Sequence, residues 1–206
     1  MDPLSIVVFI VILLFSVIFH EVAHGLMAYK LGDPTAKYEG RLTLNPIPHI
    51  DLFGSIILPA LLYWAGLPIL GSAKPVPVNY ANLKDVRSGM FLVSIVGPLT
   101  NVALALVAAA VYRLAPNLSD VGAELVVQTV QLNIVLVLFN MIPIPPLDGS
   151  KILASILGYI NHNWMYRFLE LERFGFIFVL VLVMIPGLLS SILIGPLLTI
   201  MQFLLT

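Results

Sequence analysis

The chain has 206 residues, of which 60% are hydrophobic and only 10% are charged, and its mean hydropathy is +1.04. This composition excludes an ordinary soluble globular domain and is typical of proteins that cross a membrane several times. The formal net charge of -1 and the lack of a basic block argue against nucleic acid as a partner. The absence of cysteine excludes disulfides and thiolate sites, so a metal would have to be held by His, Asp or Glu.

The predicted elements begin with a helix from Pro3 to Leu31, which Gly32-Asp33-Pro34 would end. Residues 36–48 alternate in character around Gly40 and predict a short β-hairpin. Five further segments follow: the apolar stretches 52–71, 89–112 and 121–142, an amphipathic piece at 150–172, and an apolar tail at 174–206.

These segments predict an all-α polytopic membrane protein with about five to six membrane segments. We expect a single membrane-embedded domain over residues 1–206, with a core at 3–160 and a C-terminal membrane tail at 174–206. The tail is interrupted at Pro186-Gly187 and Gly195-Pro196, which is compatible with one kinked span or with two.

The sequence His20-Glu21-Val22-Ala23-His24 lies inside the first apolar segment. On a helix, positions i and i+4 share one face, so both imidazoles can reach one cation while Glu21 lies beside them. Ionisable groups are costly inside a membrane, and a bound metal would compensate for that cost. This is the layout of a zinc peptidase. The alternative is a pair of buried histidines that hydrogen-bond to neighbouring helices.

Asp148 is the best candidate for a third metal ligand. Pro143, Pro145 and Pro146 prevent regular helix just before it, so an extended backbone can turn its carboxylate inward. The same Asp-Gly pair is also a good N-cap for a helix that starts near residue 150, and the two roles are compatible.

Three separated elements resemble the site-2 proteases, a family of membrane-embedded zinc metalloproteases. They are His20-Glu21-Val22-Ala23-His24-Gly25, Gly97-Pro98-Leu99-Thr100-Asn101, and Asn140 through Asp148-Gly149. The resemblance implies one Zn²⁺ per chain on His20, His24 and Asp148, with Glu21 as the catalytic base and Asn140 near the reacting carbonyl.

The resemblance also implies the partners: a transmembrane protein substrate, cut in or near its membrane segment, and the lipid bilayer. The chain is similar to a minimal member, because it carries neither an inserted peptide-binding domain nor a C-terminal nucleotide-sensing domain. We expect an extended substrate to pair with the edge of residues 36–47. The sequence carries no signal for an oligomeric state.

The position of Asp148 constrains the topology. To meet His20 and His24, the chain must cross the membrane an even number of times between Leu31 and Asp148, so one of three apolar stretches cannot be an ordinary span. We expect 52–71 to re-enter, because Pro59 and Gly66-Leu67-Pro68 interrupt it. The Lys and Arg residues then gather on the catalytic side, and Arg113 lies opposite. This predicts a multi-pass protein of the cell membrane with its active site toward the cytoplasm.

Depth separates the two asparagines. His20 lies roughly 25 Å along its helix, close to the cytoplasmic boundary of a hydrocarbon layer roughly 30 Å thick. Asn140 ends a segment next to Asp148 and is the better oxyanion donor. Asn101 lies deeper and, with Gly97, is expected to support helix packing.

His49 and Asp51 could assist the ligands, but an interfacial histidine and a helix-capping aspartate are the favoured roles. Two other classes of function stay open. One is a membrane metal-binding or transport protein that uses the same His and Asp ligands without proteolysis, and the other is an inactive scaffold.

Overall fold

The computed structural model describes residues 3–57, 64, 73–115, 117–185 and 187–206, and every regular element in these ranges is helical. In chain order the elements are α1 (Pro3–Leu31), α2 (Thr35–Tyr38), η1 (Ile47–His49), the π-helical η2 (Leu52–Ile57), η3 (Tyr80–Asn82), α4 (Val86–Leu114), α5 (Asp120–Asn140), α6 (Asp148–Ile160), α7 (His162–Leu169), η4 (Glu170–Phe174), α8 (Gly175–Met184) and α9 (Leu188–Leu205).

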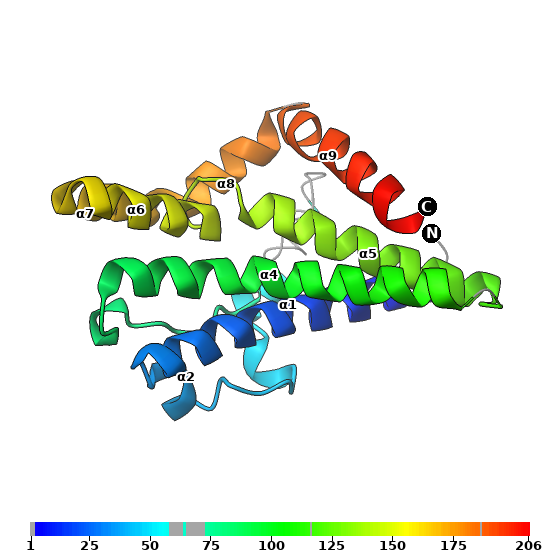
Figure 1. The fold of residues 1–206 in the computed structure, drawn as a ribbon, viewed down its shortest axis with the longest axis horizontal. Coiled ribbons are helices and arrows are strands. Elements are labelled where there is room, and N and C mark those ends of the chain that lie inside the picture. Colours follow the sequence, from blue (N-terminus) through cyan, green and yellow to red (C-terminus); the bar gives the residue numbers. More distant parts are fainter. Residues whose placement is uncertain (1–2, 58–63, 65–72, 116, 186) are drawn as a thin grey trace.

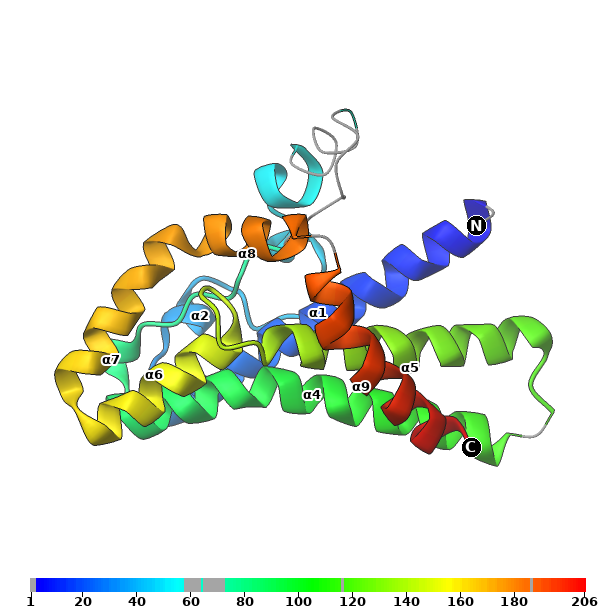
Figure 2. The ribbon, with the colours of Figure 1, turned by 90° about the horizontal axis from the view of Figure 1, so that it is seen from above.

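The central element is α4, which packs against α1, α5 and α6 (Figure 1). The helices α6 and α7 extend past one end of α5, and α8 and α9 then return so that α9 packs on α5 (Figure 2). Between α4 and α5 the core consists of Ala105, Ala109, Val130 and Ile134, which side chains of α9 cover. The alanines allow the helices to approach closely.

Within the described residues, four helices are long and apolar enough to cross a membrane: Ser5–Leu31, Val86–Leu114, Asp120–Asn140 and Leu188–Leu205. Two of them, α4 and α5, lie between Leu31 and Asp148, as the even-crossing argument requires. The prediction of five to six segments is not confirmed by these four. Of the stretch 52–71, residues 58–63 and 65–71 lie outside the described residues, so its re-entrant course stays a prediction.

The β-hairpin predicted for residues 36–48 is not found, and this region holds α2 and η1 instead. Local side-chain acceptors explain the difference. Asn45 N–H donates to Thr43 Oγ1 and Ile47 N–H donates to Asn45 Oδ1, so backbone groups that a hairpin would pair across strands are bound within two residues. Pairing of a substrate with a strand at 36–47 therefore has no strand to build on.

Asp33 fastens the end of α1 to the segment that leads into α4. Gly32 ends the helix with φ 115°, a value that L side chains rarely adopt. The fully buried carboxylate of Asp33 then accepts four hydrogen bonds, from Thr35 N (3.2 Å), Thr35 Oγ1 (2.5 Å), Asn79 N (2.7 Å) and Asn82 Nδ2 (2.8 Å). This hub fixes residues 79–82 beside α1.

We predict that Asp33→Ala lowers the free energy of unfolding by roughly 2–4 kcal/mol, because hydrogen bonds to a charged group contribute about 1.5–3 kcal/mol each and the donors would lose their partner. Thermal unfolding in detergent measures the effect. The exposed Asp120→Ala variant, at the start of α5, is the control and should change stability by less than about 1 kcal/mol. Equal stability of the two variants would contradict the role of the hub.

The same carboxylate predicts a pH dependence. Burial raises the pKa of Asp33, but the hydrogen bonds from Thr35, Asn82 and Asn79 lower it more, so its pKa in the folded protein is below the ordinary 3.8. Its contribution to stability is therefore complete above pH 3.8 and is lost as the pH falls through the lower folded value. As the pH is lowered from about 4 toward this folded value, unfolding midpoints should fall more steeply for the wild type than for Asp33→Ala.

Candidate metal centre

The two histidines of α1 and the aspartate at the start of α6 meet in the buried interior. The Nε2 atoms of His20 and His24 are 2.9 Å apart, and Asp148 Oδ2 lies 3.0 Å from His20 Nε2 and 3.3 Å from His24 Nε2. All three residues are buried. Among the described residues they form a group with the composition and spacing to hold a metal ion.

These distances suit a tetrahedral zinc ion. Zinc takes His nitrogen and Asp oxygen at about 2.0–2.2 Å, which places neighbouring donor atoms roughly 3.3 Å apart. The three ligand atoms are at or slightly inside that separation. Asp148 Oδ2 is buried and has no conventional hydrogen-bond partner. A cation among the three atoms would satisfy all of them.

Helix α4 fixes which imidazole nitrogen faces the centre. His20 Nδ1 lies 2.6 Å from Asn101 Oδ1, and His24 Nδ1 lies 2.6 Å from the Val93 carbonyl oxygen. Both partners are acceptors, so both Nδ1 atoms carry the proton. The Nε2 lone pairs then point toward each other and toward the Asp148 carboxylate, as in metal sites where outer acceptors set the histidine tautomer.

A buried amide relay extends from His20 across three helices. Asn101 Nδ2 donates to Asn133 Oδ1 at 2.8 Å, and Asn133 Nδ2 donates to Ser16 Oγ at 3.0 Å. Asn101 thus makes the interhelical bond that was predicted for it. Asn101 also binds His20 through its Oδ1. The sequence analysis did not predict this contact, because it placed Asn101 deeper in the membrane than the metal.

Gly97 creates the space for the imidazoles. A Cβ at this position would lie 2.3 Å from His24 Nε2 and 2.8 Å from His20 Cε1. Gly97 thus lets α4 pack closely on α1, as predicted, and the two histidines fill the space that a side chain at this position would take.

The proline-rich turn delivers Asp148 as predicted, but the N-cap role is wrong. Helix α6 starts at Asp148 itself, its N-cap is Leu147, and no side chain caps it. Burial raises the pKa of the Asp148 carboxyl, but the adjoining imidazoles of His20 and His24 lower it more, to below its usual range. The carboxylate is therefore ionised, as a metal ligand must be.

Glu21 lies in the same cleft, which has a volume of about 340 Å³. Its Oε2 accepts a 2.7 Å hydrogen bond from the Val76 backbone N–H. Residues 75–78 and 146–148 line the cleft, together with Asn140, Tyr80 and Lys151. Asn140 donates to the Leu136 carbonyl of its own helix at 3.0 Å. Asn140 thus lines the same cleft as His20, His24 and Asp148, but its side chain hydrogen-bonds to its own helix.

His49 and Asp51 do not line this cleft. The imidazole of His49 is fully buried, with Nε2 2.9 Å from the Thr43 carbonyl oxygen, and Asp51 Oδ2 accepts from Gly54 N at 2.6 Å. Asp51 therefore caps the following turn, which was its favoured role. His49 is buried within the protein, and its position at the membrane interface stays a prediction.

Several residues of the site were not identified from the sequence. Ser16 and Asn133 carried a usable signal, since lone polar side chains in apolar helices need partners. Lys151 follows Asp148 by one helical turn. Burial lowers the pKa of Lys151, but Tyr80 and the nearby acidic side chains raise it above its usual value, so the cleft contains a cationic ammonium. The Val76 donor is a backbone group and leaves no side-chain signal.

The fold and the site together define a helical protein in which an HExxH helix and an aspartate form a buried group that could hold a metal ion. The chain is 39% identical to "Putative zinc metalloprotease YwhC" of Bacillus subtilis, over 95% of this chain and 88% of that protein. It is 33% identical to "Putative zinc metalloprotease MJ0611" of Methanocaldococcus jannaschii, over 72% of each chain. It therefore belongs to the family of zinc metalloproteases that contains YwhC.

A further relative is "Putative zinc metalloprotease Rip2" of Mycolicibacterium smegmatis, which is 28% identical over 90% of this chain and 71% of that protein. No family model and no solved structure matches the chain.

We predict that Gly97→Ala abolishes zinc binding, because the new methyl group would occupy the space of the His24 imidazole. Elemental analysis of the purified protein measures the zinc content. Gly195→Ala is a matched control, since a Cβ there meets open space. Full zinc occupancy in Gly97→Ala would contradict the arrangement.

We also predict that Asn101→Ala weakens zinc binding by roughly 10–100-fold, the usual effect of removing the partner of a metal-ligating histidine. Competition with a chromophoric chelator gives the dissociation constant. Thr100→Ala on the same helix should leave it unchanged, because Thr100 Oγ1 donates only to the Val96 carbonyl of its own helix. Equal affinities of the two variants would show that the relay does not support His20.

Proposed function

We propose that the protein is an intramembrane zinc metalloprotease of the site-2 type, which hydrolyses peptide bonds in or near transmembrane segments of other membrane proteins. The observation that carries this proposal is the meeting of His20, His24 and Asp148 beside Glu21, in a cleft between helices of membrane-spanning length. Membership of the zinc metalloprotease family supports the hydrolytic chemistry.

His20, His24 and Asp148 would hold one zinc ion, with donors that match zinc in type and separation. When bound there, zinc supplies Lewis acidity that makes water reactive near neutral pH and polarises a peptide carbonyl. The hydrogen bonds from the two imidazole Nδ1 atoms to Asn101 Oδ1 and the Val93 carbonyl oxygen keep both rings oriented for this role.

Glu21 is the general base in this proposal. It takes the proton of the attacking water and returns it to the leaving nitrogen as a general acid, a role typically worth roughly 10²–10⁴-fold in rate. Asn140 donates to the oxygen on which negative charge develops, a contribution of roughly 3 kcal/mol for a donor of this type. To do so, its amide must turn from the Leu136 carbonyl.

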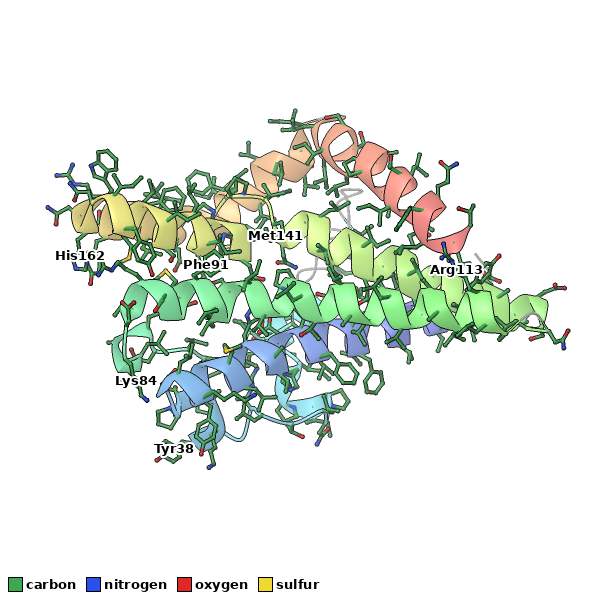
Figure 3. All side chains as sticks on the ribbon, viewed as in Figure 1. Tyr38, Lys84, Phe91, Arg113, Met141 and His162 are labelled. Carbon is green, nitrogen blue, oxygen red and sulfur yellow. The ribbon has the colours of Figure 1, made fainter. Side chains whose placement is uncertain are left out.

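The four apolar helices support a multi-pass membrane position for the site. Figure 3 shows Lys84 and His162 toward one end of the molecule and Arg113 at the other. Helix α5 ends at Asn140, which lines the cleft, and its 21 residues span about 31 Å. The site then lies near one face of the hydrocarbon. By the distribution of Lys and Arg, we assign that face to the cytoplasm.

The proposed substrate is a membrane segment that has lost its helical structure locally. A helix hides its carbonyl groups in its own hydrogen bonds, and the cleft of about 340 Å³ has room only for a short extended stretch. Substrates with helix-weakening residues near the cut should be preferred.

We predict that Glu21→Gln lowers cleavage of a synthetic transmembrane substrate by roughly 10²–10⁴-fold and leaves zinc content unchanged. The assay uses protein in liposomes, with cleavage followed by mass spectrometry. Glu39→Gln, at an exposed position after α2, is the matched control and should retain full activity.

Removal of a ligand should act differently from removal of the base. Asp148→Ala is expected to lose zinc and cleavage together. If neither the wild type nor Glu21→Gln cleaves any substrate while zinc crosses the vesicle membrane, the protein is a metal transporter and the proposal is wrong.

A further inference from the structure

The carboxylate of Glu21 is held by a backbone N–H from a segment that is distant in sequence. Residues 74–78, Lys-Pro-Val-Pro-Val, have no helix or strand and pass across α1 at Glu21. The N–H of Val76 donates to Glu21 Oε2 at 2.7 Å. A hydrogen bond of this kind, between a neutral donor and a charged acceptor, is among the stronger ones in proteins.

The side chain of Val76 also contacts α1. Val76 is buried, and a Cβ on Gly25 would lie 2.7 Å from Val76 Cγ1. The missing side chain at Gly25, one turn beyond Glu21, therefore admits Val76. The contact sets where the N–H of Val76 meets the carboxylate.

Buried Arg41 holds the other side of the segment. Its Nη2 donates to the carbonyl oxygens of Lys74 at 2.7 Å and Pro75 at 3.2 Å, and the N–H of Lys74 donates to the His49 carbonyl at 2.9 Å. Pro75 and Pro77 have no N–H and restrict the backbone on both sides of Val76. Val76 is thus a donor at a defined place in a stiff segment.

A general base must present one oxygen to the reacting water in a fixed orientation, although a glutamate side chain has three rotatable bonds. We propose that Val76 is a positioning residue for Glu21. Its backbone N–H, placed by Gly25 and Arg41, binds Oε2 and leaves Oε1 for proton transfer. The catalytic part of this inference rests on the proposed function, whereas the contact itself does not.

The contact is tested first by amide exchange. The chain has only two Pro-Val pairs, Pro75-Val76 and Pro77-Val78. Labelling with carbonyl ¹³C proline and ¹⁵N valine therefore selects two amide signals, with Val78 as an internal reference. In zinc-loaded protein in micelles, exchange at Val76 should be roughly tenfold faster in Glu21→Ala than in Glu21→Gln, which keeps an acceptor oxygen, while Val78 stays unchanged. Equal exchange at Val76 overturns the inference.

The consequence for catalysis is tested by removing the donor. Val76→Pro lacks the N–H, and its position before Pro77 already favours a compatible extended backbone. We expect kcat to fall roughly 10–100-fold, with KM and zinc content unchanged. Val76→Ala keeps the N–H but loses the side-chain contact at Gly25, so its kcat should lie between those of the wild type and Val76→Pro. Arg41→Met, which frees the segment from a distance, should lower kcat in the same direction.

The outcomes separate the two proposals. Faster exchange at Val76 in Glu21→Ala together with normal kcat in Val76→Pro overturns the positioning role and leaves the protease assignment intact. Loss of zinc in Val76→Pro assigns the segment to metal binding and also overturns it. A wild type that holds zinc and cleaves nothing overturns the proposed function, and the amide experiment still decides whether Val76 binds Glu21.

Discussion

The Nε2 atoms of His20 and His24 and the Oδ2 atom of Asp148 lie within hydrogen-bond distance of one another. No imidazole proton lies between them, because each ring carries its proton on Nδ1. Both Nδ1 atoms donate to oxygen acceptors on α4, so two nitrogen lone pairs and an anionic oxygen converge in a buried space. Such a cluster is unfavourable in an apolar interior unless a cation lies within it. The close packing of α1, α4 and α6 is the framework that keeps these atoms together.

Helix α4 serves the centre through one stripe of its surface. Val93, Gly97 and Asn101 follow one another at four-residue intervals, as His20 and His24 do on α1. One helical turn therefore supplies a carbonyl acceptor, the next a space without a side chain, and the third an amide. Two helices with the same repeat can match each other over several turns, which places every partner.

The sequence predicted most reliably what local patterns encode. The end of α1 at Leu31 agrees with the prediction, α1 is helical from Pro3, the first described residue, and the geometry brings together the three expected ligands. The hairpin failed because side chains such as Asn45 bind the nearby backbone, a competition that alternation of residue types does not reveal. The partners that depend on tertiary packing could not be derived. Asn133 lies far along the chain from Ser16, and the Val76 donor is a peptide group common to nearly all residues.

The unequal lengths of α4 and α5 determine where hydration can reach the interior. Helix α5 stops at Asn140, and the following residues 141–147 are non-helical, whereas α4 continues beside α6. Peptide groups outside a helix cannot be left facing hydrocarbon, so this bend must border protein or solvent. Asn140 and residues 146–148, at the two ends of this bend, line the cleft next to the imidazoles. In the proposed intramembrane protease, which would consume one water per bond cut, the bend would give that water a short path to the site without a pore across the bilayer.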